Sequence, residues 1–268
     1  MLKDITIGQY FPGNSPIHRL DPRMKIVLTF AYIIMLFSTT SFFALGLCVL
    51  FATVCFAISQ IPFRMILRSL RPIVPIVIFT AFLNMLFIEG ETVFQWWIIT
   101  ITQEGISTAI FMTVRIICLI GGTSLLTYTT SPIALTDGIE RLMSPLKKLG
   151  LPVHELAMMM TIALRFIPTL IAETEKIMSA QKARGADMES GGLMQRAKAL
   201  IPVLIPLFVS AFRRAEELAL AMECRCYRGG EGRTRMKQLK IGGVDVVACA
   251  VLCIAFGGVI FLNYWMQY

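Results

Sequence analysis

The chain has 268 residues, of which 56% are hydrophobic and only 16% are charged, and its mean hydropathy is +0.71. Soluble globular domains carry roughly 25% charged residues, so this composition excludes an ordinary soluble domain and indicates an integral membrane protein. The net charge of +8 lies mainly between the apolar segments, where basic residues set topology and attract anionic lipid headgroups. The basic residues form no continuous patch with interleaved aromatic residues, which argues against a nucleic-acid partner.

The first 25 residues form a polar, turn-rich segment whose basic side chains predict a cytoplasmic N-terminus. Asp21 followed by Pro22 predicts a helix start, because aspartate caps helices well and proline suits the first helical position. A four-helix membrane region is predicted over residues 26–130. Its apolar segments are 26–37, 42–58, 72–88 and 106–127.

The connections in this region differ in charge. Residues 60–72 carry Arg64, Arg68 and Arg71 and are predicted to face the cytoplasm. Residues 89–104 contain acidic and tryptophan residues but no lysine or arginine, which is typical of an outer loop. Arg115 lies inside the fourth apolar segment, close enough to its end for its charge to reach the interface, so we expect a structural role.

Residues 131–241 predict a cytoplasmic helical domain. A short amphipathic helix at 133–142 is followed by two long helices between Pro152 and Gly230, bent by Pro168 in the first and by Pro202 and Pro206 in the second. Parts of both helices are apolar enough to suggest membrane spans. If both crossed, however, a set of basic residues would lie outside the cell: Lys176, Lys182, Arg184, Arg196 and Lys198. We therefore predict that both lie at the cytoplasmic interface.

Residues 242–268 predict a last membrane helix. An apolar stretch at 246–262 is followed by Tyr264 and Trp265, which suit the membrane interface. The fold class predicted is thus an all-α integral membrane protein with about five transmembrane helices, the N-terminus inside and the C-terminus outside.

Each long helix of residues 131–241 ends in an arginine between small residues. The sequences are Ala183-Arg184-Gly185 and Cys224-Arg225-Cys226. Arg184 follows Leu170 and Ile177 at spacing seven, and Arg225 follows Ala211 and Leu218, so each arginine continues an apolar stripe. Charged side chains such as Glu173 are predicted on the opposite, solvated face.

Two interpretations of these arginines are open. The helix macrodipole favours a cation in the last turn by roughly 0.3 to 1 kcal/mol, which would explain one such arginine. An arginine occurs at the same place on both helices, each time continuing the apolar stripe. This repetition favours side chains that dock into acidic pockets of other proteins.

The sequence contains no motif for catalysis or metal binding. No HExxH, GxSxG, Walker A or glycine-rich phosphate loop occurs, which indicates a non-catalytic protein without a cofactor of its own. Cys224-x-Cys226 is too tightly spaced for a zinc site, and only His18 and His154 are available to complete one. No apolar segment carries a carboxylate away from its ends, which argues against a proton-coupled carrier.

Three stretches resemble the transmembrane T component of energy-coupling-factor (ECF) transporters. They are the N-terminal stretch that includes Tyr10, Pro12-Gly13, Ser15, His18-Arg19-Leu20-Asp21-Pro22-Arg23 and Lys25, then Ala183-Arg184-Gly185, and then Ala221-Met222-Glu223-Cys224-Arg225-Cys226-Tyr227. The resemblance covers essentially the whole chain. The first small-Arg-small motif matches the family as it stands, whereas the second departs from it in having cysteines on both flanks.

The resemblance implies a role and partners. In that family, residues corresponding to 131–241 form coupling helices whose arginines, here Arg184 and Arg225, dock into two ABC-type ATPases of the EcfA and EcfA′ kind. The same component holds a membrane-embedded, substrate-binding S component for a vitamin or a similar micronutrient in the bacterial cell membrane. ATP would then be bound by the partners and not by this chain. The alternatives are a self-sufficient secondary transporter and a membrane anchor or assembly protein.

Overall fold

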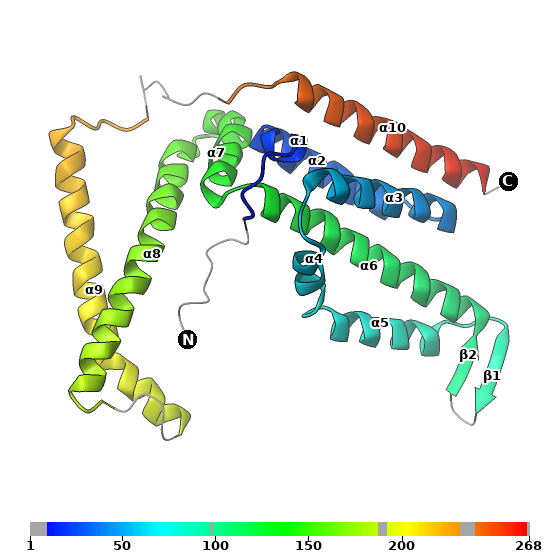
Figure 1. Cartoon of the computed structure of the whole chain (residues 1–268), viewed down its shortest axis with the longest axis horizontal. Helices are drawn as coiled ribbons and strands as arrows, with labels where there is room; N and C mark the ends of the chain where they lie inside the picture. Colours follow the sequence, from blue (N-terminus) through cyan, green and yellow to red (C-terminus); the bar gives the residue numbers. More distant parts are fainter. Residues whose placement is uncertain (1–9, 97–98, 187–191, 231–238, 267–268) are drawn as a thin grey trace. The chain divides into compact units, whose positions relative to one another are not determined.

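The computed structural model describes residues 10–96, 99–186, 192–230 and 239–266, and these are mostly helical (Figure 1). The chain divides into two compact units. Among the described residues, one unit, the membrane unit, comprises 10–138 and 239–266, and the other, the long-helix unit, comprises 139–186 and 192–230. An all-α membrane fold was predicted and is confirmed, apart from one short hairpin.

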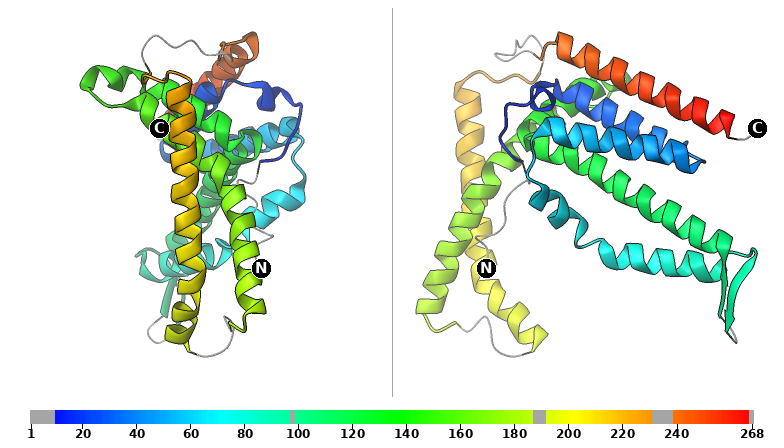
Figure 2. Two further views of the ribbon diagram at one scale, coloured as in Figure 1. Left: turned by 90° about the vertical axis from the view of Figure 1, so that its left-hand side faces the viewer. Right: turned by 45° about the vertical axis from the view of Figure 1, so that its right-hand side comes forward.

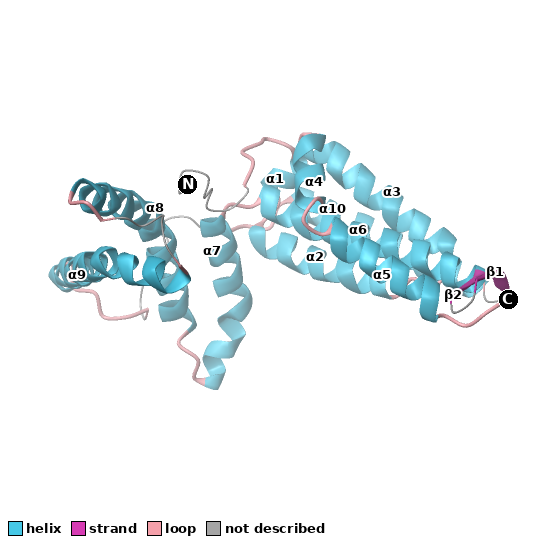
Figure 3. Cartoon of the chain, turned by 90° about the horizontal axis from the view of Figure 1, so that it is seen from below, coloured by secondary structure: helices cyan, strands magenta, loops and turns pink. Residues whose placement is uncertain are grey.

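The membrane unit consists of helices that run alongside one another (Figure 3). Its core is formed where four of them meet, with Tyr32, Leu36, Cys48, Cys118 and Val259 among the buried residues. The elements are α1 (Pro16–Arg19), α2 (Pro22–Phe37), α3 (Phe42–Ser59), α4 (Phe63–Leu70), α5 (Val74–Phe87), β1 (Thr92–Trp96), β2 (Ile99–Thr102), α6 (Gln103–Thr129), the first part of α7 (Pro132–Met143) and α10 (Gly243–Trp265).

Polar side chains fix the turns of this unit. Asp21 caps α2 through the Arg23 amide, 2.9 Å away, as the Asp-Pro pair predicted. The guanidinium of Arg115 donates to the backbone carbonyl and the hydroxyl of Thr39 in the turn between α2 and α3, and it lies 4.7 Å from the centre of the Phe111 ring. Asn263 of α10 binds the same turn, since its Nδ2 donates to the Ser38 carbonyl over 2.6 Å.

The third predicted segment differs from the structure. The stretch before Pro72, expected to be a connection, folds as the separate helix α4, which is bent by 58° from α5. Pro72 explains the break, because it has no amide hydrogen to continue the helix. The expected outer loop contains the antiparallel pair β1–β2, in which Thr92 pairs with Thr102 and Trp96 with Ile99. These strands are rich in β-branched and aromatic residues, which favour strands.

Several helices are long and apolar enough to cross a bilayer. In the described part of the chain these are α3, α6, α8 and α10, and the bent pair α4–α5 qualifies as a fifth. This set of candidate spans differs from the predicted set in two helices. Helix α2 was predicted to span but has only 16 residues, and α8 was predicted at the interface but is long and apolar enough to span. The chain is thus a multi-pass membrane protein.

The long-helix unit is dominated by two helices, α8 (Val153–Ala183) and α9 (Leu193–Cys224), which follow the end of α7 and the 3₁₀ helix η1 (Ser144–Leu149). They pack side by side in opposite directions (Figure 2). Near one end, Gln181 Nε2 donates to the Pro202 carbonyl over 3.1 Å. Near the other end, the backbone of Gly230 packs against the His154 ring.

Glu173 lies between these two helices, so its prediction on a solvated face was wrong. Its carboxylate accepts a hydrogen bond from the Ser210 hydroxyl and pairs with Arg214 Nη2 at 2.9 Å. The sequence pattern of α8 alone could not predict this contact, because both partners come from α9.

Candidate docking site at two helix ends

The end of α8 is a complete Schellman motif around Arg184. Arg184 is the C-cap residue, and Gly185 after it takes the left-handed conformation with φ +85°. The Gly185 amide donates to the Lys182 carbonyl and the Ala186 amide to the Gln181 carbonyl, each over 3.0 Å. These are the two bonds that define the motif. Glycine is favoured here because it has no Cβ to clash at positive φ.

The end of α9 repeats this geometry around Arg225. Arg225 is the C-cap residue, and Cys226 takes the left-handed conformation with φ +55°. The Cys226 amide donates to the Glu223 carbonyl over 2.8 Å and the Tyr227 amide to the Met222 carbonyl over 3.0 Å. The cysteine that departs from the family motif therefore occupies the position where glycine is usual, and it does so without changing the hydrogen bonds.

The two motifs present their arginines to solvent. Ala183, Arg184 and Gly185 are all exposed, and so are Cys224, Arg225 and Cys226. Within the described part of the chain, neither arginine has a hydrogen bond or ion pair to a side chain. An arginine on a capped helix end has a backbone of fixed direction and five free donors, which suits recognition of a carboxylate.

The antiparallel packing of α8 and α9 sets the two arginines apart. Arg184 follows the end of α8 at which Gln181 contacts Pro202 of α9. Arg225 follows the end of α9, and Gly230, a few residues later, contacts His154 at the start of α8. The arginines therefore lie at opposite ends of the helix pair, separated by on the order of 40 Å, the length of a helix of this size. The candidate site residues thus fall into two groups, one around Arg184 and one around Arg225.

The N-terminal stretch that carries the family resemblance lies in the membrane unit, where it forms a buried polar network. The Asp21 amide donates to Asp245 Oδ1 over 2.8 Å, and Arg23 makes a two-pronged pair with the Asp21 carboxylate and also donates to the Leu239 carbonyl. Lys25 Nζ donates to the carbonyls of His18, over 3.1 Å, and Thr129, over 2.8 Å. The network joins the start of α2, the start of α10 and the end of α6.

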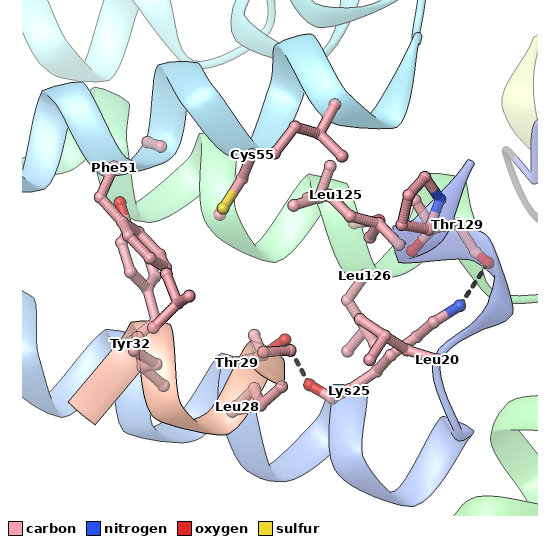
Figure 4. A pocket seen from close by; sticks show the side chains of 18 of the residues that line it. Leu20, Lys25, Leu28, Thr29, Tyr32, Phe51, Cys55, Leu125, Leu126 and Thr129 are labelled. Carbon is pink, nitrogen blue, oxygen red and sulfur yellow. Dashed lines mark hydrogen bonds between the residues drawn. The ribbon is translucent and has the colours of Figure 1, made fainter. Parts of the chain in front are cut away.

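A cavity of about 260 Å³ lies beside this network (Figure 4). Its walls are apolar side chains of α2, α3, α6 and α10, including Leu28, Phe51, Leu125 and Leu252, and Lys25 lies at one end. Figure 4 shows the Lys25 ammonium turned toward the Thr129 carbonyl. The residues labelled in Figure 4 therefore pack the helices of the membrane unit together, and Lys25 joins the start of α2 to the end of α6.

No group of three His, Cys, Asp or Glu side chains within the residues the structure describes is arranged to hold a metal ion. The seven cysteines are free, with Cys48 and Cys118 buried in the core of the membrane unit.

Comparison with known proteins agrees with these features. The model of the CbiQ family, described as cobalt transport protein, matches residues 13–236. The chain belongs to this family. The matched region includes residues 13–25 of the N-terminal stretch and both arginine motifs.

Relatives of the family are similar over their full length. The energy-coupling factor transporter transmembrane protein EcfT of Ruminiclostridium cellulolyticum is 54% identical over 264 residues, which cover 98% of this chain and 99% of the relative. The protein of the same name from Clostridium kluyveri is 55% identical over 258 residues, covering 95% and 96%, and that from Bacillus subtilis is 47% identical over 264 residues, covering 98% and 100%. The resemblance to the transmembrane component of ECF transporters is confirmed, and with it membership of a transport family.

Proposed function

We propose that this chain is the non-catalytic coupling subunit of an ECF-type importer. Arg184 and Arg225 each dock into an acidic groove on one of two ABC-type ATPase subunits, of the EcfA and EcfA′ kind, which bind and hydrolyse ATP. The membrane unit and the long helices hold an S component that binds a vitamin or a similar micronutrient. The proposal agrees with the EcfT names of the full-length relatives.

The observation that carries the proposal is the repeated cap around Arg184 and Arg225. Each guanidinium follows a rigid helix end, is exposed, and has no acidic partner in the described residues. A charge-assisted pair with a carboxylate in the groove of another protein would use donors that this chain leaves unused. Two such ends, one at each extremity of the α8–α9 pair, suit two ATPase subunits better than one.

A second partner is supported by the apolar side chains of α9. Phe208 is 61% exposed, Val209 64% and Phe212 73%, and Ile201 and Ile205 also lie largely open to solvent. Exposed apolar surface of this extent is typical of an interface with a protein or a membrane. We assign it to the membrane-embedded S component.

The coupling step follows from the contacts between α8 and α9. When ATP binding closes the two ATPase subunits, each displaces the helix end that it holds. The pair between Glu173 and Arg214 and the bond from Gln181 to Pro202 join the helices, so the displacement reaches the surface that holds the S component. No nucleotide binds to this chain in the cycle.

The orientation that this function requires has α8, α9 and the N-terminus in the cytoplasm and the C-terminus outside, in the bacterial cell membrane. Basic residues are frequent near the start of α2, on α4 and in the long-helix unit, and they are absent from residues 89–104. This distribution supports the orientation by the positive-inside rule.

The test is the double variant Arg184→Ala with Arg225→Ala in the intact complex. We expect loss of ATPase co-purification and of ATP-dependent uptake in proteoliposomes, because an unpaired carboxylate left in a closed groove costs on the order of 3 to 5 kcal/mol. Arg213→Ala is the matched control, since Arg213 is an exposed arginine of α9 that pairs with Glu217 at 3.4 Å.

Each rival function gives a different result. Full ATPase association and uptake by the double variant would refute docking through these arginines. Uptake driven by an ion gradient without ATPases would indicate a secondary transporter, and ATPase binding without any substrate movement in the wild-type complex would indicate an anchor.

A further inference from the structure

Helix α4 carries a stripe of three arginines. Arg64, Leu67, Arg68 and Arg71 follow one another at the spacing i, i+3, i+4 and i+7, which puts them on one face of the helix. All four are exposed. Like charges at this spacing repel one another, so the stripe is unfavourable unless an anion lies beside it.

No carboxylate of the surrounding helices neutralises these charges. Residues 60–88 and 105–130, which include α4, α5 and most of α6, contain no aspartate or glutamate. Within the residues that the structure describes, the side chains of the three arginines have no ion pair and no hydrogen bond. Any anion that compensates these charges therefore comes from outside this part of the chain.

A cavity of about 540 Å³ lies between α4, α5 and α6, next to the stripe. All three arginines line it together with apolar side chains such as Leu67, Ile117 and Ile120. Figure 1 shows α4 and α5 following one another alongside α6. The cavity thus combines a cationic edge with a long apolar wall.

The position of α4 on α6 matches the depth of lipid headgroups. The hydroxyl of Tyr128, in the last turn of α6, donates to the Met65 carbonyl of α4 over 3.1 Å. Thr129, next to Tyr128, accepts from Lys25 in the polar network at the start of α2. The arginines are therefore near the end of a membrane helix, and Ile117, about three turns earlier in α6, lies deeper.

We propose that this cavity binds one anionic phospholipid, with its phosphate against Arg64, Arg68 and Arg71 and an acyl chain along Leu67, Ile117 and Ile120. Arginine forks bind phosphate oxygens in pairs, and basic pockets between membrane helices bind anionic headgroups. The bilayer around a multi-pass protein supplies such lipids directly. The inference does not depend on the docking of ATPases by Arg184 and Arg225.

The test compares lipid retention by the full-length chain in detergent, measured by native mass spectrometry after addition of phosphatidylglycerol or phosphatidylcholine. We expect phosphatidylglycerol to be retained preferentially. In the variant Arg64→Gln, Arg68→Gln, Arg71→Gln its retention should fall by about fivefold per arginine removed. The triple variant Arg141→Gln, Lys147→Gln, Lys148→Gln removes the same charge from exposed positions outside the cavity and should retain the lipid.

A second variant separates a lipid from a free anion. Ile117→Trp fills the apolar wall without changing charge and should weaken phosphatidylglycerol binding as well, because the acyl chain loses its place. Competition by inorganic phosphate alone would show that a free anion is enough to fill the site, and it would overturn the proposal. Unchanged retention of phosphatidylglycerol in Ile117→Trp would show that no acyl chain lies along this wall, and it would overturn the proposal as well.

Two further outcomes would also overturn it. Equal retention of phosphatidylcholine would show that the surface holds any lipid without regard to charge. A cross-link from Leu67→Cys to another protein chain in the assembled transporter would show that a protein covers the cavity.

Discussion

Arg184 and Arg225 are equivalent residues in two copies of one capping motif, since each is the C-cap of a long helix and each precedes a residue with positive φ. The macrodipole explains a cation at a helix end, but it acts equally on any residue of the last turn. It does not explain why both arginines occupy the same cap position. The shared geometry explains why a small residue follows each arginine, because that residue adopts the left-handed conformation.

The first prediction concerns that left-handed position. Gly185→Ala should destabilise the end of α8 by about 1 kcal/mol, because a Cβ at φ +85° clashes with the backbone. Hydrogen exchange of the Ala186 amide, which donates to the Gln181 carbonyl, should become faster. Cys226→Ala is the control, since Cys226 already carries a Cβ at positive φ and its neighbour Tyr227 should keep its exchange rate. Equal effects at both sites would contradict the role of glycine.

The second prediction concerns the buried carboxylate of Asp245, which is 3% exposed. Asp245→Ala leaves the amides of Asp21 and Gly242 without their acceptors and should destabilise the membrane unit by about 1 to 3 kcal/mol per unsatisfied group. A thiol-reactive dye can follow thermal unfolding through the buried Cys48 and Cys118. Glu91→Ala, at an exposed position, should leave the transition unchanged.

The third prediction concerns the pair between Glu173 and Arg214. Their side chains are 21% and 37% exposed, so solvent screens the pair only in part. A double-mutant cycle with Glu173→Gln and Arg214→Gln should give a coupling energy of about 0.5 to 1 kcal/mol in thermal unfolding. Arg213 and Glu217, which are 81% and 66% exposed, form a comparison pair for which a smaller coupling is expected. A coupling of zero at Glu173 would mean that the pair does not join the two helices.

The sequence predicted those features that depend on local chemistry. The Asp21-Pro22 start of α2 is one example, and the apolar segments of α3, α6 and α10 are others. Arg184-Gly185 also contains a readable signal, since glycine after the last helical turn is typical of a Schellman motif. The residue type of Cys226 does not predict its positive φ, because cysteine is not typical of this position. The conformation is evident only from the hydrogen bonds that Cys226 and Tyr227 make with the last turn of α9.

Features that depend on distant residues were not predictable. The position of Glu173 in the sequence pattern of α8 predicts a solvated face. In the structure its carboxylate instead binds Ser210 and Arg214 of α9. The N-terminal stretch indicated the family correctly, but its pattern did not show that Asp21 and Lys25 bind atoms of α6 and of the start of α10. In each case the partner lies at least 37 positions away along the chain, where no periodicity connects the two.

The fourth prediction concerns the side of the membrane on which α8 lies, because this helix is apolar enough to span a bilayer by length and composition. In a variant without its native cysteines, Ser179→Cys near the end of α8 should react with a membrane-impermeant maleimide only after the cells are permeabilised. Ser179 and Glu91 are both exposed, so protein packing blocks neither. Glu91→Cys is the positive control, since residues 89–104 are proposed to lie outside. Labelling of Ser179→Cys in intact cells would put Arg184 on the wrong side for an ATPase and refute docking there, while leaving the lipid site on α4 open.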